Sequence, residues 1–144
     1  KKMINLIKSS YQKAPQFKIV FPFLENCLLH DDCNLFNFLL NSIKSINSLL
    51  DINTRITTSS SIKIDHGLRS QDKVISICKS LGGEIYINAI GGMELYKRQD
   101  FLLEDINLKF IKSLDSVNKL SIIDEMMFNS IDQVKQSLNS FSLE

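Results

Sequence analysis

The chain has 144 residues, of which 44% are hydrophobic and 23% charged. This composition is typical of a folded domain and excludes wholesale disorder, and no apolar run approaches the roughly 18 residues of a membrane-spanning helix. Lysine and arginine number 17 and aspartate and glutamate 16, so the net charge of +1 argues against a nucleic-acid-binding surface.

The amino-terminal third predicts helices. Residues 3–13 and 17–29 place apolar side chains three to four positions apart, with the second helix broken or started near Pro22. A third helix of about 17 residues, capped by Asp32 or Asn34, carries the longest apolar stripe, from Leu35 to Leu50.

The pattern then changes to one of strands. Residues 54–58 are rich in β-branched side chains and predict a short strand, and residues 84–88 predict a second. Between them, Ser70 is expected to cap a helix that ends at Gly82-Gly83. The interval of about 30 residues is that of a β-α-β unit.

The last segment adds a strand and helices. A short helical piece is expected around residues 93–96, and residues 107–111 predict the third strand. Ser121 and Ser130 each fit the start of a helix with a capping box.

The fold class predicted from these elements is α/β. We expect three short, mostly parallel strands with helical crossovers, a Rossmann-like partial sheet flanked by about three amino-terminal helices and by carboxyl-terminal helices. The chain is expected to be one domain over residues 1–144, helical in 1–53 and α/β in 54–144. Because it opens with Lys1 inside an amphipathic pattern, we expect it to be the carboxyl-terminal part of a longer protein.

The three cysteines indicate a cytoplasmic protein with reduced thiols, because their number is odd and no Cys-x-x-Cys pair occurs. The run from His30 to Cys33 contains ligand-type side chains, but adjacent residues converge poorly on one ion, so a loop is preferred to a metal site. The sequence carries none of the phosphate-loop, dinucleotide-binding or nucleophile-elbow motifs, and it identifies no cofactor.

Ligands of an open parallel sheet bind beyond the carboxyl ends of its strands. Asn88, Gly91 and Gly92 follow the second predicted strand there, and their amide and N–H groups suit a phosphate or a sugar. Two adjacent glycines more often form an ordinary tight turn, so this interpretation is preferred. Glu94 is either a general base beside the ligand or a carboxylate that complements a helix start.

A second polar cluster precedes the helix at residue 70. Arg69 is placed to bind a phosphate or carboxylate with both guanidinium arms, or else it is an exposed residue beside a cap; Gln71 and Asp72 lie next to it. Near the carboxyl terminus, Ser121 and Asp124 fit a capping pair better than a catalytic pair.

Four stretches, in the same order, resemble the WbqC-like family of bacterial proteins: residues 11–17, 67–75, 86–96 and 120–129. The stretches YINAIGGMELY and SIIDEMMFN are the most specific. The resemblance covers nearly the whole chain. Two positions depart from the pattern, since Ala89 replaces a common proline and Met93 a common arginine, which weakens the anion-binding prediction for the glycine turn.

The resemblance implies a role in the biosynthesis of O-antigen or another surface polysaccharide, as a transferase that passes an aminoacyl group, glycine, to a sugar. It implies a small-molecule or nucleotide- or lipid-linked sugar substrate, with other enzymes of glycan assembly as partners. The candidate catalytic residues are Glu94, Asp124 and Asp72, and the candidate substrate-binding residues are Arg69, Gln71, Asn88, Gly91, Gly92, Tyr96 and Asn129.

Two other functions remain open. One is a non-catalytic binding or scaffolding module, which predicts a contiguous apolar surface patch and no small-molecule pocket. The other is a Rossmann-like nucleotide-binding transferase, which rests on the β-α-β interpretation alone.

Overall fold

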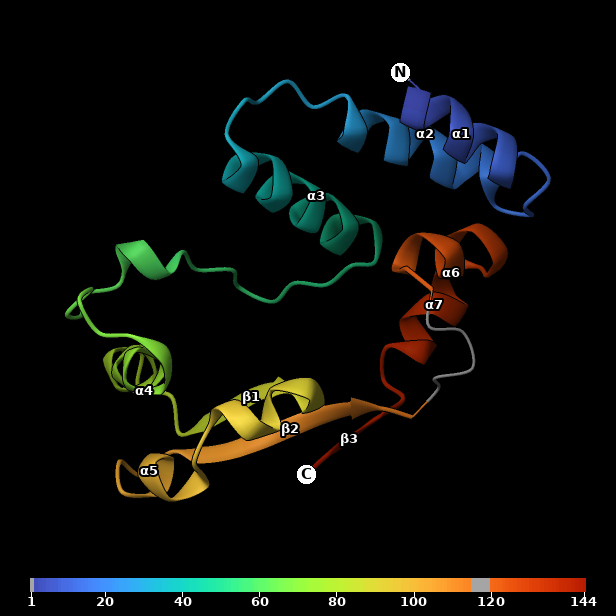
Figure 1. The fold of residues 1–144 in the computed structure, drawn as a ribbon. Helices are drawn as coiled ribbons and strands as arrows, with labels where there is room; N and C mark the ends of the chain where they lie inside the picture. The colour runs from blue at the N-terminus through green and yellow to red at the C-terminus, as the bar shows by residue number, and fades with distance from the viewer. Residues whose placement is uncertain (1, 115–119) are drawn as a thin grey trace. The chain divides into compact units, whose positions relative to one another are not determined.

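A computed structural model describes residues 2–114 and 120–144 (Figure 1). These residues form two compact units: a helical unit of residues 2–54 and 120–139, and an α/β unit of residues 55–114 and 140–144. The sequence-based division into one domain with a helical and an α/β part stays a prediction.

The helical unit contains the three predicted amino-terminal helices, α1 (Lys2–Tyr11), α2 (Phe17–Leu28) and α3 (Leu35–Leu49). Two short helices, α6 (Ile122–Phe128) and α7 (Ile131–Ser137), complete it. Its core is formed by apolar side chains of α1, α2, α6, α7 and the connecting turns: Ile4, Ala14, Val20, Phe21, Leu24, Leu50, Met126, Met127 and Val134.

The prediction that α2 is broken or started near Pro22 is wrong, because the helix begins at Phe17 and continues through the proline. Pro22 is exposed, whereas Val20, Phe21 and Leu24 of the same helix are buried. Burial of these side chains therefore outweighs the lost backbone hydrogen bond.

Helix starts were predicted with mixed success. Asn34 caps α3, since its Oδ1 accepts hydrogen bonds from the N–H groups of Phe36 (2.9 Å) and Asn37 (3.3 Å). Ser130 and Gln133 form the predicted capping box of α7. Ser121 occupies the capping position of α6, so the predicted helix start is confirmed, but its side chain makes no cap bond and the predicted capping box is not formed.

The α/β unit contains a 3₁₀ turn (Ser59–Ser61), α4 (Ser70–Ser80), β1 (Ile85–Ala89), a second 3₁₀ turn (Ile90–Leu95) and α5 (Arg98–Leu102). Strands β2 (Asn107–Ser113) and β3 (Phe141–Leu143) complete a sheet of order β1-β2-β3. The β1–β2 pair is parallel and the β2–β3 pair antiparallel. The α/β fold class is confirmed.

One predicted strand is wrong and one strand was missed. Residues 54–58 are not a strand: Thr54–Thr57 are exposed, and no strand pairs with them in the described structure. β-Branched residues favour a strand only where neighbours pack against them. The third strand is β3, which pairs Leu143 with Ile111 and Phe141 with Ser113.

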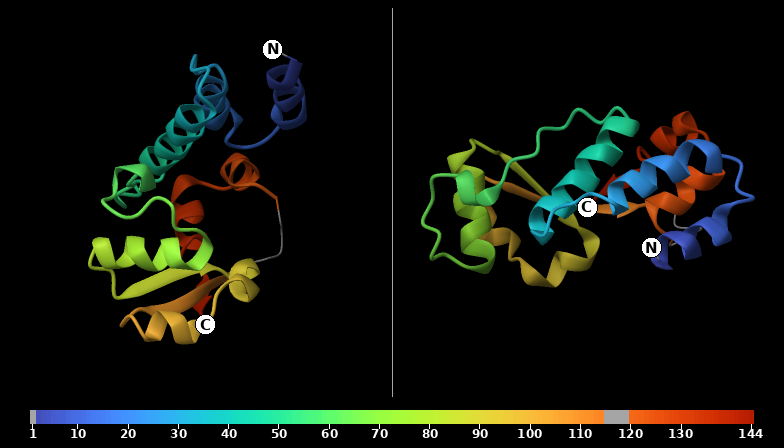
Figure 2. Two further views of the ribbon diagram at one scale, coloured as in Figure 1. Left: turned by 60° about the vertical axis from the view of Figure 1, so that its left-hand side comes forward. Right: turned by 90° about the horizontal axis from the view of Figure 1, so that it is seen from above.

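The core of the α/β unit lies between the sheet and its helices, and Figure 2 shows α4 beside the sheet in both views. It is formed by Cys78, Phe101, Ile106, Leu108 and Phe110. Helix α4 ends as predicted at the glycine pair. Gly82 has a φ of +65°, and the N–H of Gly83 donates to the carbonyl of Cys78 (2.8 Å).

Candidate functional site

The first turn of α4 holds three of the predicted site residues, but Ser70 is not its cap. Arg69 occupies the capping position, and Ser70 has a φ of +46°. A serine caps best from extended backbone, which Ser70 does not have, so the capping prediction is wrong. The side chains of Arg69 and Asp72 are exposed, whereas Gln71 is half-buried.

Gln71 connects α4 to the segment that follows the second 3₁₀ turn. Its Oε1 accepts a hydrogen bond from the N–H of Lys97 (2.7 Å), and its Nε2 donates to Oδ2 of Asp100 (2.6 Å). The stretch around residue 71 is therefore held directly against the residue that follows Tyr96. Both the oxygen and the nitrogen of the Gln71 side-chain amide are hydrogen-bonded within the protein. The main role of Gln71 is therefore to position the segment that contains Lys97 and Asp100.

The end of β1 forms a tight polar turn. Asn88 is half-buried and its Oδ1 accepts from the N–H of Ala89 (2.9 Å). Its amide nitrogen lies so close to Gly92 that a Cβ on that residue would be 2.6 Å away. A Cβ on Gly91 would meet no atom within 4 Å. The absence of a side chain at Gly92 thus lets the Asn88 amide pack closely against it, whereas the space beside Gly91 is empty.

Tyr96, which directly follows this turn, belongs to an aromatic cluster. Its ring lies 5.8 Å from those of Tyr86 and Phe101, and the Tyr86 and Phe101 rings are stacked at 5.7 Å. Burial raises the pKa of the Tyr86 hydroxyl to about 12, and the adjacent Tyr96 and Cys78 act in the same direction. Ile90, at the start of the turn, and Tyr96, at its end, both pack against the core that contains this cluster.

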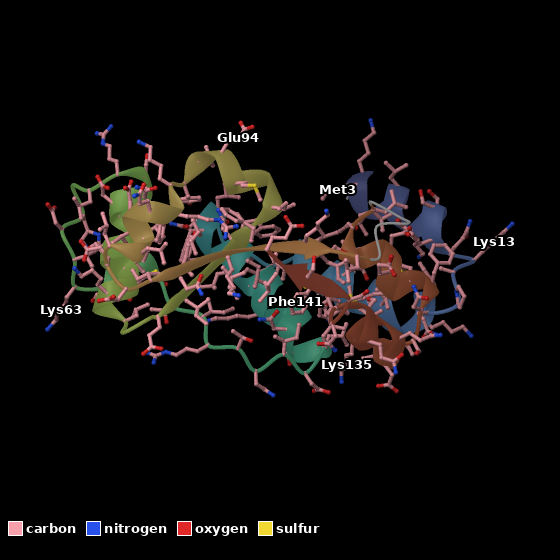
Figure 3. The ribbon with its side chains drawn as sticks, turned by 90° about the horizontal axis from the view of Figure 1, so that it is seen from below. Met3, Lys13, Lys63, Glu94, Lys135 and Phe141 are labelled. Carbon is pink, nitrogen blue, oxygen red and sulfur yellow. The ribbon has the colours of Figure 1, made fainter. Side chains whose placement is uncertain are left out.

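Glu94 lies on the outer side of the same turn. It is exposed, and Figure 3 shows its side chain projecting outward from the ribbon. Its carboxylate makes no hydrogen bond or ion pair within the described parts of the chain. An exposed carboxylate beside an open backbone turn is available to a bound ligand.

The remaining two predicted site residues lie in the helical unit. Asp124 accepts a hydrogen bond of 3.0 Å from the hydroxyl of Tyr11, a residue that the site prediction did not include. Asn129 donates from Nδ2 to Oε2 of Glu125 (3.1 Å) and to its carbonyl (3.0 Å). Both side chains therefore contact neighbours within their own unit.

The structure thus divides the predicted residues into two groups. The α/β unit holds the larger group, which surrounds the first turn of α4 and the end of β1: Arg69, Gln71, Asp72, Asn88, Gly91, Gly92, Glu94 and Tyr96. Asp124 and Asn129 form the other group, in the helical unit.

Two residues of these sites were missed. Tyr11 and Asp100 bind predicted residues through contacts that span 113 and 29 positions of the sequence. Tyr11 opens one of the family-like stretches, which was the available signal. No local pattern marks Asp100.

No group of three or more histidine, cysteine, aspartate or glutamate side chains suited to a metal ion occurs in residues 2–114 and 120–144. Within the same residues, none of the helices combines the length and apolar character needed to span a membrane.

Comparison with known proteins gave one match. The model of a family described as the WbqC-like protein family matches residues 1–136 of the 144-residue chain. No curated protein and no solved structure matched the chain.

Proposed function

Because the chain belongs to the WbqC-like protein family, we propose that it acts in the assembly of a bacterial surface polysaccharide, such as O-antigen, as a transferase. The group transferred would be an aminoacyl group, glycine, and the acceptor a nucleotide- or lipid-linked sugar. Ligand binding is assigned to the α/β unit, at the first turn of α4 and the end of β1.

The observation that carries this proposal is the double hydrogen bond of Gln71. It joins the first predicted polar stretch, residues 69–72, to Asp100 and to Lys97, which directly follows the second polar stretch, residues 88–96. A site assembled from separate stretches and fixed by a half-buried amide is pre-organised, which binding and transfer both require.

The exposed residues of this surface would have different chemical roles. Arg69 carries a permanent positive charge and would hold a phosphate of the sugar carrier. The backbone N–H of Gly91, where no atom lies within 4 Å of an added Cβ, would contribute to the same anion. Glu94 would act as general base, taking the proton from the sugar nucleophile as it attacks the acyl carbon and the donor's leaving group departs.

The first experiment is a thermal-shift screen of this chain with nucleotide sugars, ATP, glycine and other amino acids. Occupancy at 100 times the dissociation constant stabilises a protein by about 2.7 kcal/mol, which raises the melting temperature by several degrees. We expect a shift with a nucleotide sugar that Arg69→Ala removes. Absence of a shift with every compound would count against a ligand site on this chain.

Catalysis is tested by comparing two glutamates at opposite ends of β1. Glu94→Gln should abolish glycine transfer while leaving the melting temperature unchanged. Glu84→Gln, an exposed residue just before β1, should retain full activity. Equal activity of both variants would overturn the assignment of Glu94 as the base.

A binding or scaffolding module is the second candidate, and helix α3 is the observation that favours it. No residue of α3 is buried, and Leu35, Phe36, Leu39 and Ile43 expose between 49% and 70% of their surface. Exposed apolar stripes of this kind are typical of protein-binding surfaces. Leu39→Ser should weaken complex formation with other assembly enzymes under this reading and leave glycine transfer intact.

A further inference from the structure

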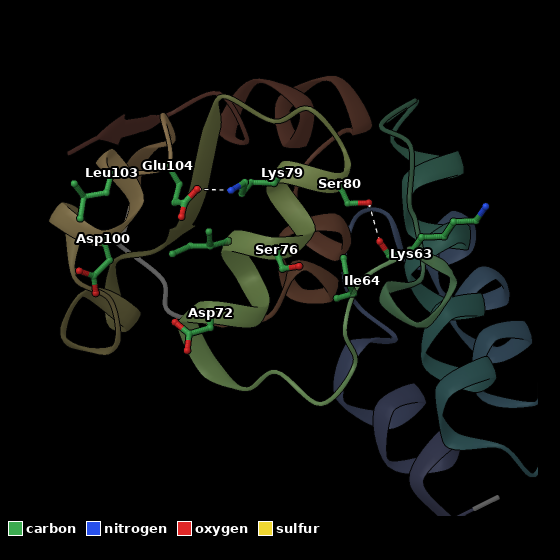
Figure 4. A pocket seen from close by; sticks show the side chains of 10 residues that line it. Lys63, Ile64, Asp72, Ser76, Lys79, Ser80, Asp100, Leu103 and Glu104 are labelled. Atoms are coloured by element: carbon green, nitrogen blue, oxygen red, sulfur yellow. Dashed lines mark hydrogen bonds and ion pairs between the residues drawn. The ribbon is translucent and has the colours of Figure 1, made fainter.

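An open groove of about 740 Å³ lies over the outer face of α4 (Figure 4). Asp72, Ser76 and Lys79 of α4 line it at helical spacing. The loop around Ile64 lies on one side, and Leu103 of the turn after α5 lies on the other. The groove has a size that small ligands occupy.

The charges that line the groove are unequal. Lys79 forms an ion pair with Glu104, so these two charges neutralise each other. Asp100 is held by the Gln71 amide, which carries no charge. Asp72 has no ion-pair partner in the described parts of the chain.

The second lysine of the groove does not compensate Asp72. Figure 4 shows the Lys63 side chain extending away from Asp72, toward the opposite side of the view. The Asp72 end of the groove is therefore negative, and it favours a cation over a phosphate or a carboxylate.

The remaining lining is suited to hydroxyl groups and to the edges of a saturated ring. Ser76 offers a hydroxyl that donates and accepts. The Ser80 hydroxyl donates to the carbonyl of Lys63 (3.4 Å) and keeps its lone pairs as acceptors, and Ile64, Ile75 and Leu103 supply apolar walls. The Asp72 and Lys79 positions are seven residues apart on the helix, which corresponds to about 10 Å. A single sugar ring with its substituents fits between them.

We propose that this groove binds an amino sugar, with the protonated amine at Asp72 and the ring hydroxyls at Ser76, Ser80 and the Lys79–Glu104 pair. A bare polyamine would leave the serines unused, and a neutral sugar would leave Asp72 uncompensated. The inference names a substrate class for the proposed transferase and in that sense rests on the proposed function, but its test measures binding alone.

The probes are D-glucosamine, N-acetyl-D-glucosamine and D-glucose, added to the chain and followed by calorimetry at about pH 6 and about pH 9.5. At the lower pH the amine of glucosamine is protonated, and at the higher pH it is not. We expect glucosamine to bind at least tenfold more tightly than the other two sugars at the lower pH, and this preference to disappear at the higher pH.

Two matched variants locate the site. Asp72→Asn should weaken glucosamine binding about tenfold or more. Asp132→Asn, which changes an exposed aspartate in the first turn of α7, should have no effect. Equal binding of the three sugars, no binding of glucosamine, or equal affinity of both variants would overturn the inference.

The transfer assay separates this inference from the proposed function. Glucosamine binding without any glycine transfer would contradict the proposed function and leave the groove assignment standing. Transfer that Asp72→Asn does not impair, together with no glucosamine binding, would contradict the groove assignment and leave the transferase standing.

Discussion

The hydroxyl of Tyr11 donates a hydrogen bond of 3.0 Å to Oδ1 of Asp124, across 113 positions of the sequence. It connects the last residue of α1 to α6, and the ring of Tyr11 also lies 6.1 Å from that of Phe128. Nearby, the N–H of Gln16 donates to the carbonyl of Met127 (3.0 Å). These contacts connect the amino- and carboxyl-terminal parts of the helical unit.

Tyr11→Phe should lower the free energy of unfolding by about 1 kcal/mol, because the ring packing remains and one part-buried hydrogen bond is lost. Urea unfolding of Tyr11→Phe, Asp124→Asn and the double variant provides the measurement. The double variant should cost little more than the worse single variant, since both remove the same bond. Additive losses would show that the two residues act separately.

The same pair predicts a dependence on alkaline pH. The hydrogen bond to Asp124 raises the pKa of Tyr11 above 10.0, and burial and the carboxylate charge add to this effect. A raised folded-state pKa favours the neutral phenol, so the contribution to stability is fully present below about pH 10 and is lost as the pH rises through the raised pKa. Tyr11→Phe should therefore lose less stability than the native chain on going above pH 10.

The helices were predictable because their signals are local. Apolar spacing located α1, α2 and α3, and the Ser130–Gln133 box and the Asn34 cap lie within a few residues of the helices they start. The helix-cap predictions failed where a side chain makes a contact with a residue far away in the sequence. Asp124 reads as a partner for Ser121, but Tyr11 binds it from the other end of the chain.

Strand prediction failed where the formation of a strand depends on hydrogen-bond pairing with a distant strand. Residues 54–58 have strand composition without a partner, and β3 is a strand of three residues because β2 extends far enough to pair with it. In the same way, the residue types of the candidate site could be predicted from their place beyond β1. Their connection through Gln71 depends on Asp100 and Lys97, which no pattern marked.

Gln71 offers a test of whether the candidate surface is held together as observed. Gln71→Ala should destabilise the α/β unit by about 2 kcal/mol, because it removes two hydrogen bonds. Gln99→Ala, an exposed residue of α5, should be nearly neutral. Thermal unfolding of both variants measures the difference.

Gln71→Glu keeps the acceptor for Lys97 and replaces the donor to Asp100 with a second carboxylate. Repulsion between the two carboxylates should destabilise this variant at neutral pH. The deficit should shrink in acid, because protonation of a carboxylate removes the repulsion. A deficit that is the same at both pH values would show that Asp100 does not face residue 71.

The aromatic cluster predicts a late tyrosine titration. Burial, with the adjacent Tyr96 and Cys78, raises the pKa of Tyr86 to about 12, so the contribution of the neutral phenol is complete below about pH 10 and is lost between about pH 10 and 12. Ultraviolet absorbance of phenolate against pH should show this late step. Tyr86→Phe should remove it and make melting less sensitive to pH in this range.

The glycine pair beyond β1 provides the closest comparison between neighbouring positions. A Cβ on Gly92 would lie 2.6 Å from the Asn88 amide nitrogen, so the amide must rotate and give up its hydrogen bond to the N–H of Ala89. Gly92→Ala should therefore cost about 1 kcal/mol. Gly91→Ala meets no atom within 4 Å and should be neutral or stabilising by up to about 1 kcal/mol.

Asn88→Ala distinguishes this steric cause from a general preference for glycine in the turn. In that background the displaced amide is absent, so adding Gly92→Ala should cost almost nothing further, whereas Gly91→Ala should behave as it does in the native chain. Unfolding free energies of the native chain and the five variants (three single and two double) close both cycles. If Gly92→Ala remains as costly without Asn88, the clash is with another group.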